Sequence, residues 1–387
     1  MVMRQRWIAR LGLCLTILLL SGCVGIAIHL VKYAHKKNAP AGAATITAPP
    51  PIVRDELNDA VAKGAPGVTA IVMRGDTLLF RMDVGPIDKN AQWPVASASK
   101  WLTAALVMTV VDEGKLSLDA PISRYLPGLS GRIGKTTLRQ LLAQTSGEGS
   151  LEDGADIRQD PRMTLAESAA EILQRPLADD PGAVFKYGGP SFQVAGALVE
   201  TATGKRWAEL FDERIAKPLG MTHTYWTHLP SDGATPAQTL NPLLQGGVVT
   251  TADDYMRFLG MLAKNGTSNG HRILSRQAVD AMETVQTLGT PMAYMPPGMA
   301  SGSKAGRKLQ YALGNWCELW TADLHCTLVS SAGALGTYPW VDRQSGLYGI
   351  FFTQERLTKV TANYLRARTA ILAAYAPARD TSDNGVK

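Results

Sequence analysis

Residues 95–108 read Val-Ala-Ser-Ala-Ser-Lys-Trp-Leu-Thr-Ala-Ala-Leu-Val-Met, and this stretch decides how the rest of the chain is interpreted. The run from Trp101 to Met108 is apolar nearly all round, which is typical of a buried helix. Ser97 then lies in the first turn, where the helix dipole favours a developing alkoxide. Lys100, three residues on, falls on the same face within reach of the hydroxyl. Because burial disfavours a charged ammonium, this lysine is poised to take the serine proton.

The tetrapeptide Ser97-Ala98-Ser99-Lys100 is by itself a weak signal, because S-x-x-K occurs by chance about once in a few hundred residues. A second copy, Ser301-Gly302-Ser303-Lys304, sits in a Gly/Pro-rich stretch with no helical pattern after it. The plain alternative for the first copy is an N-cap serine beside a lysine that extends to solvent. The rest of the sequence has to decide between the two interpretations.

Several stretches, in order along the chain, resemble the class C β-lactamase-related serine hydrolases, a family that includes carboxylesterases and D-amino-acid peptidases. Residues 97–100 match its first motif, and residues 137–147 (TLRQLLAQTSG) are similar to its TIRHLLTHTSG segment. The resemblance covers roughly Leu57 to Ala374. The other matching stretches are Phe185-Lys186-Tyr187, Lys217-Pro218-Leu219-Gly220-Met221 followed by Thr224, and Gly246-Gly247-Val248-Val249-Thr250-Thr251-Ala252-Asp253-Asp254.

The resemblance assigns roles to further residues. It implies that Tyr187 is the second acid/base group, hydrogen-bonded to Ser97, with its ionisation eased by Lys100. A lone tyrosine is otherwise a half-buried core ring, but the position of this one just before a helical pattern, in the family's order, favours catalysis. The third motif falls at Ser331-Ala332-Gly333. The backbone N–H groups of Ala334 and Ser97 would then form the oxyanion hole.

Two departures from the family pattern bear on the substrate. The family's Tyr-x-Asn, whose amide contacts the acyl side chain of β-lactams, is Tyr187-Gly188-Gly189 here. The cation that starts the third motif in lactamases and D-peptidases is replaced by Ser331. We therefore expect an esterase-like hydrolase that forms an acyl-enzyme at Ser97 on a small ester, amide or peptide-like substrate. The alternatives are a β-lactamase or D-amino-acid peptidase of the same fold, and a catalytically silent protein that binds cell-wall fragments or a partner protein.

The hydrophobic patterns predict an α+β fold. A helix over Ile52–Lys63 precedes a hairpin whose strands, Val68–Met73 and Thr77–Met82, meet at Arg74-Gly75-Asp76. The other end of the chain reads as strands Thr327–Ser331, Thr337–Val341 and Leu347–Thr353 and a closing helix Thr361–Tyr375. Together the two ends predict one antiparallel sheet flanked by N- and C-terminal helices, as in the β-lactamase/transpeptidase fold, with an inserted helical subdomain over about 101–293. The helical patterns of that insertion are Trp101–Asp112, Thr137–Gln144, Leu165–Leu173, Ser191–Thr203, Trp207–Ile215, Ala252–Lys264 and Ser275–Glu283.

The N-terminal region predicts export. Leu11–Ile28 is an uncharged apolar stretch after an Arg-bearing start, as in a signal sequence or a membrane span. Leu20-Ser21-Gly22-Cys23 resembles the lipobox of bacterial lipoproteins, in which the cysteine is lipidated; Val24–Val31 stay apolar, which equally fits an uncleaved signal anchor. We expect residues 1–37 to be this leader or anchor, 38–51 an Ala/Pro-rich linker, 52–376 the hydrolase domain and 377–387 a flexible tail. The expected location is the periplasmic side of a bacterial cell envelope, tethered to the membrane.

Outside the leader the only cysteines are Cys317 and Cys326. They lie on two expected strands, Tyr311–Trp320 and His325–Ser331, and symmetric pairing about the turn Thr321-Ala322-Asp323 puts them opposite each other. A disulfide there would fit an oxidising compartment. Two buried free thiols are the alternative.

Charge and motif content exclude other classes of protein. The net charge of +6 is inflated by six Lys/Arg in the first forty residues, and the body has no basic run with interleaved aromatics, so we expect no nucleic-acid partner. There is no Gly-rich phosphate loop and no G-x-S-x-G elbow. We expect no metal and no organic cofactor, because the histidines beyond the leader are scattered, at His223, His228, His271 and His325.

Overall fold

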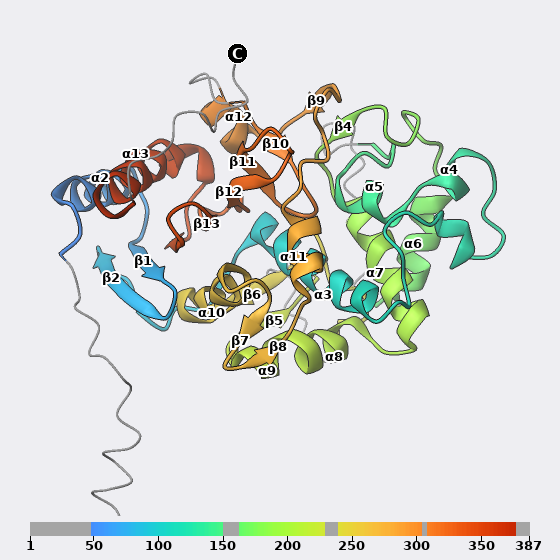
Figure 1. The fold of residues 1–387 in the computed structure, drawn as a ribbon, viewed down its shortest axis with the longest axis horizontal. Coiled ribbons are helices and arrows are strands. Elements are labelled where there is room, and N and C mark those ends of the chain that lie inside the picture. The colour runs from blue at the N-terminus through green and yellow to red at the C-terminus, as the bar shows by residue number, and fades with distance from the viewer. Residues whose placement is uncertain (1–47, 150–161, 229–238, 304–307, 377–387) are drawn as a thin grey trace, which may run out of the picture. The chain divides into compact units, whose positions relative to one another are not determined.

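The computed structural model describes residues 48–149, 162–228, 239–303 and 308–376 (Figure 1). All of them belong to one compact unit of the chain, Ile46–Lys387. The expected leader (1–37), most of the expected linker and the expected tail (377–387) lie outside the described residues. Within the described ranges, no helix combines the length and the apolar character needed to cross a bilayer.

The two ends of this unit build one seven-stranded antiparallel sheet, in the order β10-β11-β12-β13-β14-β1-β2. The N-terminal hairpin joins the C-terminal strands through β1 and β14, where Thr69 pairs with Phe352. The β1–β2 turn lies at Gly75-Asp76, as the sequence predicts, and Gly75 has the positive φ (55°) that such a turn favours. The strands are β1 Val68–Arg74, β2 Thr77–Val84, β10 Gln310–Tyr311, β11 Trp316–Trp320, β12 Cys326–Ser330, β13 Tyr338–Asp342 and β14 Leu347–Phe352.

Helices cover both faces of the sheet. Helix α2 (Pro51–Ala62) lies beside α13 (Leu357–Tyr375) on one face, and α10 (Ala252–Ala263) packs on the other (Figure 1). Strand β14 shows why both faces are apolar: Phe351 packs in the cluster under α2 and α13, whereas Ile350 and Phe352 pack in the cluster on the opposite side. The predicted antiparallel sheet flanked by the N- and C-terminal helices is confirmed, and both of these helices lie on the same face.

The chain between β2 and β10 is mainly helical. The α-helices are α3 Ser99–Asp112, α4 Gly131–Lys135, α5 Leu138–Leu142, α6 Leu165–Leu173, α7 Pro190–Thr203, α8 Trp207–Phe211, α9 Lys217–Leu219, α10, α11 Arg276–Met282 and α12 Pro297–Ser303. Two 3₁₀ turns, η1 Ala96–Ala98 and η2 Ile122–Arg124, and a π-helical turn, η3 Asp212–Ala216, accompany them. Short strands form β3 (Trp93–Pro94)-β6 (Val248–Thr250)-β5 (Tyr225–Trp226), the parallel pair β4 (Phe185–Lys186)-β9 (Met292–Tyr294), and β7 (Thr267–Ser268)-β8 (His271–Arg272).

Three expected elements differ from the observed ones. The closing helix begins at Leu357, four residues earlier than predicted. The predicted helix Trp207–Ile215 changes to a π-helical turn at Asp212, near Pro218, which has no N–H to donate to the carbonyl four residues back. The predicted strand Tyr311–Trp320 is interrupted by a turn at Gly314 (φ 78°), whose Cα packs against α3 so closely that a Cβ would lie 2.7 Å from the Lys100 carbonyl oxygen.

The hairpin β11–β12 carries a disulfide between Cys317 and Cys326, whose Cα atoms are 5.5 Å apart. The symmetric register from which this pair was expected is wrong, because Cys317 faces Val329 and Cys326 faces Trp320. The ladder shifts on both sides of Leu319. Such irregularities bend and twist a strand, and here the two cysteines approach although they are not ladder partners.

Candidate active site

Ser97 lies in a tight turn at the N-terminal end of α3. It belongs to η1, and α3 begins two residues later at Ser99. Ala96 has a positive φ of 45°, a strained conformation for a residue with a Cβ, and such strain is common at functional sites. Helix α3 is buried almost all round, as its sequence predicts, whereas Ser97 is only partly buried. The turn thus presents the serine hydroxyl at the positive end of a buried helix dipole.

Lys100 is brought to Ser97 by the first turn of α3. Its side chain is buried, with 1% of the residue exposed. The Nζ atom lies 3.4 Å from Ser97 Oγ and donates a 3.0 Å hydrogen bond to the backbone carbonyl of Gln245. The same Nζ lies 4.5 Å from the centroid of the Tyr187 ring. The structure therefore brings together the three side chains that the sequence nominated for catalysis.

Tyr187 follows β4 and is enclosed by aromatic rings. It stacks on Trp316, with 5.4 Å between centroids and 14° between planes, and meets Tyr311 edge-on at 5.9 Å. Burial raises the pKa of Tyr187 well above its usual range, and a hydrogen bond with the Ser97 hydroxyl offsets this only in part. Burial thus opposes the ionisation of this phenol that the family resemblance implies. Tyr187 is protonated at neutral pH and can give a proton.

Gln144, which sequence reasoning missed, holds the Tyr187 segment in place. Its side-chain Oε1 accepts the N–H of Gly188, and its backbone carbonyl accepts the N–H of Lys186 at 3.1 Å. Its Nε2 donates to Tyr311 Oη at 3.2 Å. The only signal in the sequence is that glutamine stands where the similar TIRHLLTHTSG segment has histidine.

The predicted third motif lies against the Ser97 turn. Ser331 follows the end of β12, and its Oγ lies 3.4 Å from the carbonyl oxygen of Ser97. Gly333 approaches so closely that a Cβ there would be 2.0 Å from the Val95 carbonyl oxygen, so only glycine fits. Among the described residues, the Ala334 N–H donates to no backbone or side-chain acceptor, while its carbonyl accepts from Leu357. This N–H is thus available to an oxyanion.

A buried carboxyl group lies at the end of the TSG segment. Ser146 Oγ donates a 2.9 Å hydrogen bond to Glu148 Oε2. Burial disfavours the carboxylate more than this hydrogen bond favours it, which raises the pKa of Glu148 to about 7. Nothing in the sequence singled out Glu148, because the shift depends on how the fold covers it.

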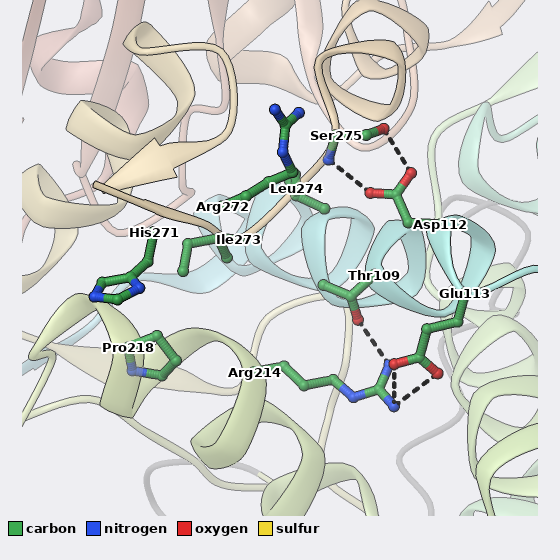
Figure 2. Close-up of a pocket in the computed structure, with 10 residues that line it drawn as sticks. All are labelled: Thr109, Asp112, Glu113, Arg214, Pro218, His271, Arg272, Ile273, Leu274 and Ser275. Carbon is green, nitrogen blue, oxygen red and sulfur yellow. Dashed lines mark hydrogen bonds and ion pairs between the residues drawn. The ribbon is translucent and has the colours of Figure 1, made fainter. Parts of the chain in front are cut away.

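A separate cleft lies at the other end of α3 (Figure 2). Helix α3 has 14 residues, so this end is roughly 20 Å from Ser97. Arg214 Nη2 pairs with Glu113 at 2.9 Å and Nη1 donates to Thr109, while Asp112 accepts from the N–H and Oγ of Ser275. The charged side chains of this cleft thus stabilise the contacts of α3 with neighbouring elements. The cleft is lined by Thr109, Asp112, Glu113, Arg214, Pro218, His271, Arg272, Ile273, Leu274 and Ser275.

The second S-x-x-K copy is placed differently from the first. Ser301 and Ser303 end helix α12 instead of starting a helix, and Lys304 lies outside the described residues. No group of three or more His, Cys, Asp or Glu side chains in the described part of the chain could hold a metal ion.

Comparison with known proteins agrees with this geometry. The β-lactamase family model matches residues 53–374, so the chain belongs to the β-lactamase family. It is a serine hydrolase of the S-x-x-K type. Both the family resemblance and the fold class predicted from the sequence are confirmed.

Three relatives place the chain within the family. The crystal structure of a candidate β-lactamase from Bacteroides dorei DSM 17855 is 32% identical, covers 82% of this chain and 97% of its own, and superposes with a TM-score of 0.72. Esterase EstB of Burkholderia gladioli is 33% identical over 40% of this chain and 45% of its own length. The D-alanyl-D-alanine-carboxypeptidase/endopeptidase AmpH of Escherichia coli K12 is 27% identical over 51% of this chain and 57% of its own. The match thus spans about half the length of the esterase and the peptidase.

Proposed function

We propose that the protein is an esterase-like hydrolase that forms an acyl-enzyme at Ser97. One observation carries this proposal: Lys100 Nζ lies 3.4 Å from Ser97 Oγ, and Tyr187 is hydrogen-bonded to the same hydroxyl. A nucleophile with a base on one side and a protonated acid on the other is the arrangement that acyl transfer requires.

In the first half of the reaction, Ser97 Oγ attacks the carbonyl carbon of the substrate and its proton passes to Lys100 in the amine form. Tyr187 gives its proton to the leaving oxygen or nitrogen, and the bond from the carbonyl carbon to that atom breaks. Lys100 then returns its proton to Tyr187, which resets both groups. The product of this half-reaction is acyl-Ser97.

In the second half, water attacks the acyl carbonyl carbon and loses a proton to Lys100. Ser97 Oγ departs and takes a proton from Tyr187, which is again restored from Lys100. In both halves the negative charge develops on the carbonyl oxygen. The N–H groups of Ser97 and Ala334 are the donors proposed to stabilise it.

The absence of two residues of the family pattern favours an ester substrate over a β-lactam or a D-peptide. The site lacks the asparagine of Tyr-x-Asn at Gly189 and the cation of the third motif at Ser331. That cation helps to hold the substrate carboxylate in lactamases and D-peptidases of the family. The 33% identity with an esterase supports the same choice.

Turnover of a short-chain p-nitrophenyl ester and of a chromogenic cephalosporin tests this proposal. The full chain, purified in detergent, is compared with its Ser97→Ala variant. Ester turnover that the substitution abolishes supports the proposal, whereas cephalosporin turnover that exceeds it favours a β-lactamase. If neither substrate reacts and a fluorophosphonate does not label the protein, the result contradicts the proposal and favours a silent binding protein or a hydrolase with another substrate.

We also propose that the protein acts on the periplasmic side of a bacterial cell envelope, tethered to a membrane by its N-terminal region. The apolar stretch Leu11–Ile28, the lipobox-like Cys23 and a disulfide suited to an oxidising compartment support this location. Radiolabelled fatty acid should be incorporated into the wild type and lost in Cys23→Ala. Membrane attachment without the label indicates an uncleaved anchor, and recovery in the cytosolic fraction would contradict both forms of the proposal.

A further inference from the structure

Gly189 is covered by the side chain of Gln245. A Cβ at position 189 would lie 1.6 Å from Oε1, 1.9 Å from Cδ and 2.2 Å from Nε2 of Gln245. Atoms in proteins do not approach so closely, so no side chain fits at 189 while Gln245 keeps this position. The carboxamide of Gln245 therefore fills the volume into which a side chain at the third position of the tyrosine motif would extend.

The backbone at Leu244 and Gln245 is hydrogen-bonded to α3, which carries Lys100, and to α7, which begins directly after Gly189. Its carbonyl accepts from Lys100 Nζ at 3.0 Å. The preceding residue, Leu244, accepts at 2.6 Å from Thr103 Oγ1 of α3 and donates its N–H at 2.7 Å to Gln193 Oε1 of α7. These bonds fix the backbone from which the carboxamide extends.

The same turn also lies against the backbone that precedes the nucleophile. A Cβ at Gly246 would be 3.6 Å from the carbonyl carbon of Ala96, which is ordinary van der Waals contact. Gln245 is thus bounded by Gly189 on one side and by the residues next to Ser97 on the other. The turn that carries Gln245 thus contacts both the segment that carries Ser97 and the segment that carries Tyr187.

We propose that the Gln245 carboxamide takes over, from the 244–246 turn, the acyl-side-chain contact that relatives with Tyr-x-Asn make from the position of Gly189. A carboxamide both donates and accepts hydrogen bonds. The site is then selective for acyl groups that carry a carbonyl or amide near the scissile carbonyl, over purely apolar acyl groups of the same length. This inference rests on the proposed acyl-enzyme at Ser97.

Two esters of matched length test the selectivity: p-nitrophenyl N-acetylglycinate, whose acyl chain carries an amide, and p-nitrophenyl pentanoate, whose chain does not. The measured quantity is the kcat/KM for the acetylglycinate divided by the kcat/KM for the pentanoate, each after subtraction of spontaneous hydrolysis. Gln245→Met keeps the length of the side chain and removes its hydrogen bonds. We expect this substitution to lower the ratio by about 3- to 10-fold, the effect of one hydrogen bond.

Gln277→Met is the matched control, because Gln277 is exposed on α11. It should leave the ratio at the wild-type value. A Gln245→Met protein that keeps the wild-type ratio overturns the inference, since a merely structural glutamine would change both esters alike. Fluorophosphonate labelling separates the two proposals: absence of label at Ser97 in the wild type refutes the acyl-enzyme and the inference with it, whereas normal labelling with an unchanged ratio refutes the inference alone.

Moving the amide back to position 189 gives an independent test. Gly189→Asn alone should lower the melting temperature and slow labelling of Ser97, because the new Cβ meets Gln245. The double variant Gly189→Asn/Gln245→Gly should regain the wild-type melting temperature, the wild-type rate of Ser97 labelling and the preference for the acetylglycinate. A Gly189→Asn protein as stable and as reactive as the wild type would show that Gln245 does not fill this volume.

Discussion

The two walls of the Ser97 site differ in how they relate to the family. The nucleophile wall, formed by Ser97, Lys100 and Tyr187, keeps every residue of the family pattern and packs them within hydrogen-bonding reach. The recognition wall, formed by Gly189, Gln245 and Ser331, departs from the pattern at two motif positions. Under the proposed function, the comparison teaches that the chemistry and the choice of substrate are carried by separate residues, so the first can stay fixed while the second changes.

The largest effect is expected on the nucleophile wall. Lys100→Met, which keeps the apolar stem in its buried position, should lower kcat/KM by about 10³-fold through loss of acid/base catalysis. Because Lys100 acts on the reacting atoms, both matched esters should suffer equally. Their rates, measured beside the melting temperature, check this prediction. A Lys100→Met protein that loses far more activity on one ester than on the other would contradict the division between the two walls.

The contact between the walls is tested next. Gly333→Ala places a Cβ 2.0 Å from the Val95 carbonyl oxygen and should lower the free energy of unfolding by about 3 kcal/mol. Gly246→Ala, whose Cβ makes only ordinary contact with Ala96, should change it by less than about 0.5 kcal/mol. Urea denaturation measures both. Equal stability of the two variants would mean that the third motif is not held as tightly against the Ser97 turn as the structure shows.

Removal of one hydroxyl should have a somewhat smaller effect. Tyr187→Phe keeps the stacking on Trp316 and should lower kcat by about 100-fold. Because burial raises the pKa of Tyr187, wild-type activity should show no decline from tyrosinate formation below about pH 10. The pH–rate profile checks this, with Tyr364→Phe in α13 as a control. A basic limb near pH 7 that disappears in Tyr187→Phe would contradict the protonated state.

The smallest effect concerns the free energy of unfolding and the carboxyl group of Glu148, which belongs to neither wall. Glu148 has a pKa of about 7 in the folded state, against 4.5 when unfolded. The unfolded chain therefore loses this proton first as the pH rises, so the wild type should lose stability between about pH 4.5 and 7. Glu148→Gln should remove that loss, which we expect to be about 2 kcal/mol. Urea denaturation at pH 5 and pH 8 measures this loss. If the free energy of unfolding changes equally with pH in the wild type and in Glu148→Gln, the result would contradict a buried carboxyl group.

Much of the fold was predictable because its signals are local. The hairpin β1–β2, with its Gly75 turn, and the helix α6, with its capping threonine Thr164, follow from residues adjacent in sequence. The register of β11–β12 was not predictable, because irregularities at Leu319 replace the symmetric pairing. The short β3-β6-β5 and β4-β9 pairings also escaped prediction, since strands of two or three residues carry no periodic pattern.

The site divides in the same way. Ser97, Lys100 and Tyr187 could be predicted because they stand at fixed positions within ordered motifs, and the structure places them side by side. Gln245 and Gln144 were missed because each acts through a contact between segments far apart in sequence. The exclusion of a side chain at Gly189 becomes visible only when the turn at Gln245, 56 residues later, is seen to cover it. The burial of Tyr187 by Trp316 and Tyr311, which raises the pKa of its phenol, was also not visible in the sequence.

The central claim is that Ser97 is the nucleophile, and peptide mapping after fluorophosphonate labelling tests it most directly. Trypsin releases the tryptic peptide Asn90–Lys100, which contains both Ser97 and the buried Ser99, and fragmentation distinguishes the two. We predict one label, on Ser97, that is absent from Ser97→Ala and reduced in Lys100→Met. A label on Ser301 or Ser303 of the second S-x-x-K copy, or labelling that persists in Ser97→Ala, would contradict the account.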